Sequence, residues 1–593
     1  MGRLLGRGSV AERLKLSALV VARATRSTVS HINTNPLSRW RFAPSRTDRL
    51  LIAPQDLRTA DATRATEIYA GRFAFAGKVV ICDRRSPFEM AAPSTEWAAT
   101  LFGFSWLRHL RAGGNAITRA NARALIDDWI AVQSVGKGIA WRSDVLSRRI
   151  ISWLSHAPLV LTETDARFYR RFLRSLTRQV RYLRALFKET RDGAPRLQAA
   201  IALAYAALCL QGEFKQLRSA VRRLTDELDR QVLPDGGHIS RNPGTLVDLL
   251  LDLLPLRQAF NARQLPVPQS LNNAVDRMMP MLRFFRHGDG NFALFNGMGP
   301  TAPDLNATVL AYDDARGMPV SNAPHSGYQR MELGETVVLI DTGKPPPMAL
   351  SQEAHAGTLS FELSWRSHRI IVNCGLPAVG RETWRQVARA TAAHSTVTLN
   401  DTSSASFGDA RLFKNLLFGA PIVSGPRMVH ARREDSDDGI LLQTQHDGYV
   451  DAFGIVHART LALSADGTML AGEDHFLPPE GGTLAGRKPD EFAVRFHLHP
   501  TVRANRLRDG RGVILVMPDR EAWTFTVENG EVEIEESVFL AGSDRPRRTV
   551  QIVVYGHARD SQTVRWSFMH MPKTVSGQVP NPDEPELPLR IPD

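Results

Sequence analysis

The chain has 593 residues, of which 43% are hydrophobic and 23% are charged. These proportions are typical of globular proteins and exclude a disordered or collagen-like chain. Lys and Arg outnumber Asp and Glu by 74 to 61, so the formal net charge is +13. That excess favours an anionic partner, which could be a nucleic acid, a membrane surface or an acidic polysaccharide. Three widely spaced cysteines, Cys82, Cys209 and Cys374, exclude a CxxC metal site and a disulfide framework.

Residues 1–45 are expected to form a leader that does not cross a membrane. Its apolar run, residues 14–22, is shorter than the ~20 apolar residues that span a bilayer. Arg23 and Arg26 stand where a secretory signal has its cleavage site, so an amphipathic leader in peripheral membrane contact is favoured over a cleaved signal. The later apolar run at 197–210 is also too short to span, and no transmembrane segment is expected.

The range 46–310 is predicted to be helical. Its apolar residues recur every three or four positions, and Thr162 with Asp165 resembles a capping box that starts a helix before Phe168. Successive helical hairpins of this kind form a bundle, a solenoid or a closed (α/α) toroid. The predicted helices cover 144–154, 168–183, 197–210, 214–233 and 246–259.

The range 311–570 is predicted to be an antiparallel β-sandwich, because the period changes to two after Gly299 and turn residues separate short β-rich runs. Residues 365–368 are expected to form a hairpin tip, and Asn529-Gly530 a two-residue hairpin turn. The Pro-rich, acidic residues 571–593 are expected to form an extended tail. The predicted strands cover 336–340, 358–364, 369–373, 395–399, 512–516, 523–527, 532–538 and 550–554.

Short motifs follow one another in a fixed order through both halves. They read SQEAHAGTLSFE at 351–362, VNCG at 372–375, WR at 384–385 and AHSTV at 393–397, with DGGH at 235–238 upstream. In this order they resemble motifs of the heparinase II/III-like proteins, which are related to polysaccharide lyases. The resemblance covers about residues 50–560. It implies a multidomain α+β protein, an N-terminal (α/α) toroid followed by an antiparallel β-sandwich, that cleaves uronate-containing polysaccharides by β-elimination.

Such elimination requires a group that neutralises the uronate carboxylate, a base for the C5 proton and an acid for the leaving oxygen. The family's catalytic tyrosine falls on Thr245 and its first signature histidine on Glu353, so both groups are replaced here. Tyr328, His238 and His355 are therefore the candidate catalytic residues. The candidate substrate-binding residues are Arg241, Asn242, Arg385, Arg389 and Glu353, with Arg389 the first choice for binding a carboxylate.

The resemblance also implies a structural zinc ion in some members. The corresponding positions here are His355, Asn373 and His394, although asparagine is a weaker zinc ligand than a carboxylate. A hydrogen-bonded polar cluster that fixes the sandwich loops is the alternative interpretation.

Three functions stay open at this point. The leading hypothesis is a polysaccharide lyase that acts on an acidic polysaccharide, such as a glycosaminoglycan, in a cleft between toroid and sandwich. The alternative is a non-catalytic polysaccharide-binding or exopolysaccharide-assembly protein that has lost the acid and base. Nucleic-acid binding is least favoured, because no recognised module is visible. The family suggests the cell envelope or periplasm, whereas the lack of a clear signal peptide leaves the cytoplasm open.

Overall fold

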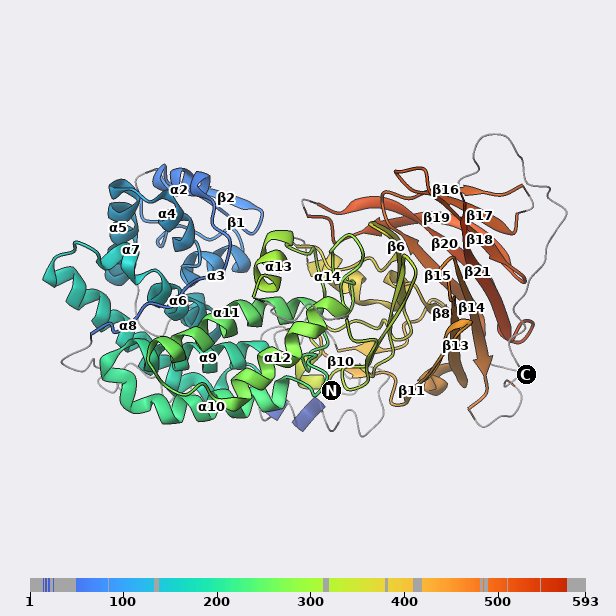
Figure 1. Cartoon of the computed structure of the whole chain (residues 1–593), viewed down its shortest axis with the longest axis horizontal. Coiled ribbons are helices and arrows are strands. Elements are labelled where there is room, and N and C mark those ends of the chain that lie inside the picture. Colours follow the sequence, from blue (N-terminus) through green and yellow to red (C-terminus); the bar gives the residue numbers. More distant parts are fainter. Residues whose placement is uncertain are drawn as a thin grey trace.

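A computed structural model describes residues 49–572, except for 84, 133–137, 313–318, 379–381, 409–418, 480–483, 485–488, 509 and 544, together with a few residues between Leu14 and Thr25. Most of the predicted leader and nearly all of the predicted tail lie outside the described residues. Helices form one end of the elongated molecule and sheets form the other, as Figure 1 shows. Within the described part of the chain, no helix is long and apolar enough to cross a membrane.

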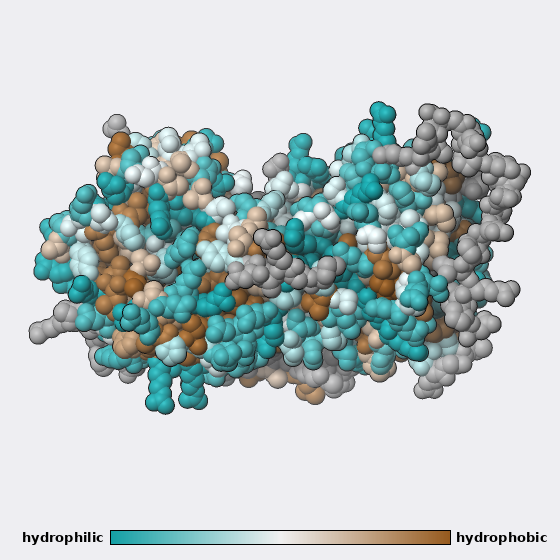
Figure 2. All heavy atoms as spheres, in the orientation of Figure 1, coloured by the Kyte–Doolittle hydropathy of each residue, from teal (hydrophilic) through white to brown (hydrophobic). Residues whose placement is uncertain are grey.

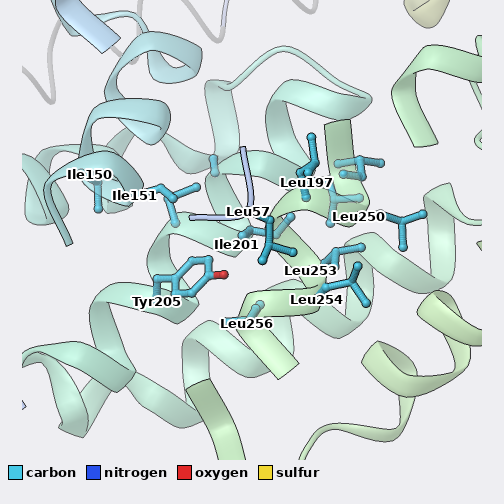
Figure 3. Close-up of a cluster of buried hydrophobic side chains, with 14 of the residues drawn as sticks. Leu57, Ile150, Ile151, Leu197, Ile201, Tyr205, Leu250, Leu253, Leu254 and Leu256 are labelled. Carbon is cyan, nitrogen blue, oxygen red and sulfur yellow. The ribbon is translucent and has the colours of Figure 1, made fainter. Parts of the chain in front are cut away.

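The helical half is built around α9, which is buried along nearly its whole length. Its alanine-rich sequence lets α6, α10 and α11 pack closely against it. The side chains labelled in the apolar cluster of Figure 3 come from α6, α9 and α11, with Leu57 beside them. Within this cluster the Tyr205 hydroxyl donates to the Asp252 carbonyl oxygen at 2.7 Å. The helices are α2 (Ala62–Tyr69), α3 (Thr95–Gly103), α4 (Leu107–Gly113), α5 (Ala116–Val132), α6 (Ser143–Ser155), α7 (Ala157–Leu161), α8 (Ala166–Leu186), α9 (Ala194–Cys209), α10 (Leu217–Gln231), α11 (Pro243–Ala262), α12 (Gln269–Phe284) and α13 (Pro303–Leu310).

Each of the helices expected from the periodicity is present. The start of α8 is confirmed, with Asp165 as N-cap accepting from the amides of Arg167 and Phe168. The helix predicted from residue 214 begins later, because residues 211–216 form a 3-10 turn. The hairpin of β1 (Arg72–Phe75) and β2 (Lys78–Ile81) was not predicted.

The second half consists of two large antiparallel sheets. One has the order β11-β12-β13-β14-β21-β18-β17-β16, and the other runs β19-β20-β15-β7-β6-β5-β4-β3 with β8 paired to β15. The strands of the first are β11 (Val429–Ser436), β12 (Gly439–Tyr449), β13 (Ile455–Ser464), β14 (Met469–Leu477), β16 (Arg503–Arg506), β17 (Gly512–Val516), β18 (Ala522–Val527) and β21 (Thr563–Met571). Those of the second are β3 (Asn322–Ala323), β4 (Tyr328–Leu333), β5 (Thr336–Asp341), β6 (Phe361–Trp365), β7 (His368–Val372), β8 (Val397–Leu399), β15 (Glu491–Leu498), β19 (Glu531–Phe539) and β20 (Arg547–His557).

The two turn predictions have different outcomes. The hairpin tip at 365–368 is confirmed, since Trp365 pairs with His368 where β6 turns into β7. The hairpin at Asn529-Gly530 is wrong, because β18 and β19 belong to different sheets and the chain crosses between the layers there. Sequence alone does not distinguish a turn within a sheet from one between sheets.

Buried polar contacts fix the toroid against the sandwich. The Arg330 guanidinium of β4 donates to the carbonyl oxygens of Phe284 and Arg286 at the end of α12. His287 contacts Glu362 of β6 at 2.9 Å. Gly288 lies so close to the β6-β7 turn that a Cβ would come within 1.7 Å of the Arg366 carbonyl oxygen, so only glycine fits. The site between the halves therefore has walls held in a fixed relation.

Candidate active-site cleft

A cleft of about 800 Å³ lies between the toroid and the sandwich. Its toroid walls come from α3, α6, α9 and α11 and from the loop that follows α12, and residues 350–354 supply the sandwich wall. In the space-filling view of Figure 2, hydrophilic residues predominate and the outline dips between the two ends of the molecule. A second hollow of about 420 Å³ adjoins the cleft, because Arg58, Arg108, Ala302 and Leu305 line both.

Helix α11 presents polar side chains to the cleft at helical spacing. Asn242 is its N-cap, accepting from the Gly244 amide at 2.9 Å, and Thr245 and Asp248 follow along the cleft wall. One turn further, the buried Asp252 accepts from Arg58 at 2.8 Å and from both terminal nitrogens of Arg148. Burial would raise the pKa of Asp252, but the two arginines hold it below its usual range. Asp252 thus pairs with two of the cleft arginines, and its single negative charge offsets one of their two positive charges.

Asp248 differs from Asp252. Its side chain is open to the cleft, and its carboxylate has no hydrogen-bond or ion-pair partner among the described residues. Its place in the depth of the cleft raises its pKa by desolvation, against the opposing charges of Arg58 and Arg148. A carboxyl group in this position is available to a ligand.

Arg108 is a positively charged group of the cleft, complementary in charge to Asp248. Its Nε donates to the Thr59 carbonyl oxygen at 2.9 Å and its Nη1 to that of Ser105 at 2.6 Å. No described carboxylate lies within ion-pair distance of it. Its pKa is lowered, first by burial and also by the neighbouring Arg58, Arg64 and Arg148, although Asp56 acts in the opposite direction. Such a cluster of guanidinium groups suits a bound anion.

Two of the predicted site residues, Asn242 and Glu353, line the cleft. Glu353 is exposed and, within the described parts of the chain, its carboxylate has no hydrogen-bond or ion-pair partner. His238, predicted as a catalytic residue, is buried and does not line the cleft. Its Nδ1 accepts from the Ser240 amide, its Nε2 donates to Gln231, and burial lowers its pKa to about 3.

Tyr328 and Arg241 are also buried away from the cleft surface. The Tyr328 hydroxyl donates to the Arg241 carbonyl oxygen at 2.6 Å and accepts from Asn296 at 2.8 Å, and burial raises its pKa. The Arg241 guanidinium donates to three sandwich carbonyl oxygens and to Asp341. Both residues hold the domains together, so the roles predicted for them in catalysis and substrate binding do not fit their positions.

The arginines of the second half do not face the cleft either. Arg389 is 2% exposed, and its guanidinium donates to the carbonyl oxygens of Ser351, Ala354 and Ala420. It shapes the loop that carries Glu353, and it does not face the cleft, where it was predicted to bind a carboxylate. Arg385 is half-buried on α14 (Glu382–Arg389) and is not among the residues that line the cleft.

The residues do not fit a zinc ion as a set of three. His394 Nδ1 donates to the Ala390 carbonyl oxygen, so its Nε2 accepts from His355 Nδ1 at 3.0 Å. Asn373 is used elsewhere, since its amide donates to Glu362 and its oxygen accepts from the Ser395 amide. No group of three or more His, Cys, Asp or Glu that could hold a metal is present in the described residues. The His355–His394 hydrogen bond agrees with the polar-cluster interpretation, although His355 Nε2 has no hydrogen-bond partner among the described residues.

The residues that sequence reasoning missed lie mainly on the toroid: Arg58, Arg108, Arg148 and Asp248. Asp248 had a usable signal, because it follows Thr245, at the family's tyrosine position, by one helical turn. Arg58 and Arg108 had none, since only the tertiary fold brings their segments to the face of α11.

The architecture and the cleft define the class: an (α/α) toroid joined to an antiparallel β-sandwich, as in the polysaccharide lyases of the heparinase type. Residues 120–304 match the family Heparinase II/III N-terminus, and residues 315–567 match Heparinase II/III-like, C-terminal. The chain is 34% identical over 540 residues to FtsZ-localized protein C of Caulobacter vibrioides (strain NA1000 / CB15N), an alignment that covers 89% of this chain and 92% of that protein. The chain therefore belongs to the heparinase II/III-like family, as its motifs indicated.

Solved structures support the same fold. The heparan sulfate lyase HepC from Pedobacter heparinus superposes with a TM-score of 0.60 at 15% identity, over 95% of this chain and 91% of that one. Heparinase III gives a TM-score of 0.65 at 14% identity, over 84% of this chain and 79% of that one. At such identities the likeness concerns the fold alone, and it confirms the predicted fold class.

Proposed function

We propose that the protein binds an acidic polysaccharide in the cleft between toroid and sandwich and does not cleave it by β-elimination. The observation that carries the proposal is the composition of the cleft wall. Among the described residues that line it, none is a tyrosine or a histidine. β-Elimination needs a base for the C5 proton and an acid for the leaving oxygen, and a phenol or imidazole usually supplies both.

Two further observations support binding. The cleft lies between the two domains and contains Arg108, which has backbone partners but no described carboxylate partner. The curated relative is named for its localisation with FtsZ and not for a reaction. Both agree with a protein that has kept the architecture for recognition or assembly and has lost the acid and base.

The test is a panel of alginate, glycosaminoglycans and bacterial exopolysaccharides, scored for binding and for the absorbance of unsaturated uronate. We expect binding without product. Appearance of unsaturated product with the wild-type protein would overturn the non-catalytic part and restore the lyase. Tight binding of DNA with no response to uronate content would instead favour the nucleic-acid hypothesis.

Replacing Arg108 by alanine is expected to weaken polysaccharide binding about tenfold, because a hydrogen bond to a charged group contributes roughly 1.5–3 kcal/mol. Isothermal titration calorimetry at physiological ionic strength measures the change. Arg218→Ala is the matched control, since Arg218 is exposed on α10 and does not line the cleft. Equal loss in both variants would mean that the chain's overall charge, and not the cleft, binds the polysaccharide.

A further inference from the structure

The charge of the cleft differs from that of the whole chain. Although the chain carries a net charge of +13, the cleft lining has as many acidic as basic side chains: Arg58, Arg108, Arg148 and Arg191 against Asp144, Asp192, Asp248 and Glu353. A site built for a densely anionic chain would be cationic throughout. The mixed charges of the lining therefore favour a ligand that carries both positive and negative groups over a densely anionic one.

The partners of these groups show which charges are available. Arg58 and Arg148 share the carboxylate of Asp252 behind the wall, and Arg58 also lies 3.5 Å from Asp56. Asp144 pairs with Arg142, and Asp192 with Arg230. Arg191 has a long contact to Gln352 at 3.4 Å. The carboxylates of Asp248 and Glu353 therefore face the cleft without a described partner, and the guanidinium of Arg108 faces it with backbone partners only.

Asp248 belongs to the toroid wall of the cleft and Glu353 to its sandwich wall. A Cβ on Gly297 would lie 2.8 Å from the Glu353 carbonyl oxygen and 3.2 Å from Asn242 Nδ2, so the Glu353 loop lies beside the N-cap of α11. Asp248 is six residues along that helix, about 9 Å at 1.5 Å per residue. A ligand that lies along α11 passes both carboxylates.

We propose that the cleft selects a mixed-charge glycan, in which free amino groups accompany acidic groups, and that Asp248 and Glu353 each bind an amino group while Arg108 binds an acidic group. This rests on the proposed function and names the ligand class of that site. An ammonium group carries a positive charge and three donors, and a carboxylate offers only acceptors. A densely sulfated glycan would place its negative charges next to the same two carboxylates. The repulsion between like charges would lower the affinity of the cleft for such a glycan.

The test compares hyaluronan, partially N-deacetylated hyaluronan and heparin at an ionic strength near 0.15 M, which screens exposed surface charges beyond about 8 Å. Hyaluronan and its N-deacetylated form share one backbone and differ in the free amine. We expect the N-deacetylated form to bind at least about tenfold more tightly than hyaluronan, the effect of one charge-assisted hydrogen bond. The heparin binding that is lost in Arg108→Ala is the binding in the cleft. We expect the affinity of this cleft binding to be lower than the affinity for hyaluronan or for its N-deacetylated form.

Glu353→Gln and Asp248→Asn should each reduce the preference for the amine toward unity and strengthen heparin binding. Both variants should fold, since neither carboxylate has a described partner, and an unchanged melting temperature verifies this. Asp226→Asn is the matched control, because Asp226 is an exposed carboxylate on α10 outside the cleft and its loss should leave the preference intact.

The outcomes separate this inference from the function on which it rests. If none of the three glycans binds, the proposed function fails. If hyaluronan and its N-deacetylated form bind equally, or if both cleft variants keep the wild-type preference, the glycan-binding function stands and the assignment of Asp248 and Glu353 to an amine is wrong. Preference for heparin that depends on Arg108 would also overturn it.

Discussion

Replacing Arg241 by methionine should lower the free energy of unfolding by about 3–5 kcal/mol, the usual cost of removing one partner of a buried ion pair. Arg241 lies in the toroid just before α11 and has a positive φ of 63°. Its side chain contacts the sandwich, and the residue is 7% exposed. It donates to the Ser326, Gly327 and Lys344 carbonyl oxygens and lies 2.5 Å from Asp341. Methionine would fill the space but leave Asp341 buried without its cation.

Urea denaturation followed by circular dichroism measures this loss. Arg218→Met on the exposed face of α10 serves as the control and should change stability by less than about 0.5 kcal/mol. Arg241→Met combined with Asp341→Leu should recover part of the loss, since the uncompensated charge is then removed. A loss below about 1 kcal/mol for the single variant would contradict the role of Arg241 in joining the domains.

Acid should destabilise the protein well above the pH at which most carboxylates titrate. Burial lowers the pKa of His238 and of His497 to about 3, and both side chains are at most 3% exposed. In the unfolded chain each histidine is protonated near pH 6.5, whereas in the folded protein it is protonated only near pH 3. Between these values the unfolded state binds more protons, so stability falls as the pH falls. Each histidine should cost about 2–3 kcal/mol between pH 6.5 and 4.5.

Denaturant midpoints at pH 7.5, 6.0 and 5.0 measure this dependence. The midpoint should fall steadily over the series, and in His238→Gln the slope should be shallower by the uptake of one proton. An equal midpoint at pH 7.5 and 5.0 would mean that these histidines are accessible to protons in the folded protein, contrary to their buried contacts with Gln231 and Ala392.

Local patterns were sufficient for most of the fold. The apolar spacing of Phe168, Phe172 and Leu176 predicts α8, and the β-rich run at 512–516 coincides with β17. These elements follow from neighbouring residues in the sequence. The order of the motifs then identified the helical half as a toroid and the β-rich half as a sandwich.

The site was predicted less well because residue type does not reveal burial. His238, Tyr328 and Arg389 have side chains suited to acid-base chemistry or anion binding, but each is used in a buried contact that tertiary structure creates. Arg241 and Asp341 meet across 100 positions of sequence. Conversely, the accessible groups Arg108 and Asp248 resemble ordinary surface residues of helices in the sequence.

The path of the chain through the two large sheets has a consequence for folding. After β8 the chain passes to the other sheet for β11 to β14, returns for β15, leaves again for β16 to β18, returns for β19 and β20, and ends in β21. This last strand lies between β14 and β18, in the interior of its sheet. During synthesis the helical half can become compact early, but the sandwich has to wait for residues 563–571 to leave the ribosome. Until then β14 and β18 have unpaired edges, which is when a chaperone would be most needed.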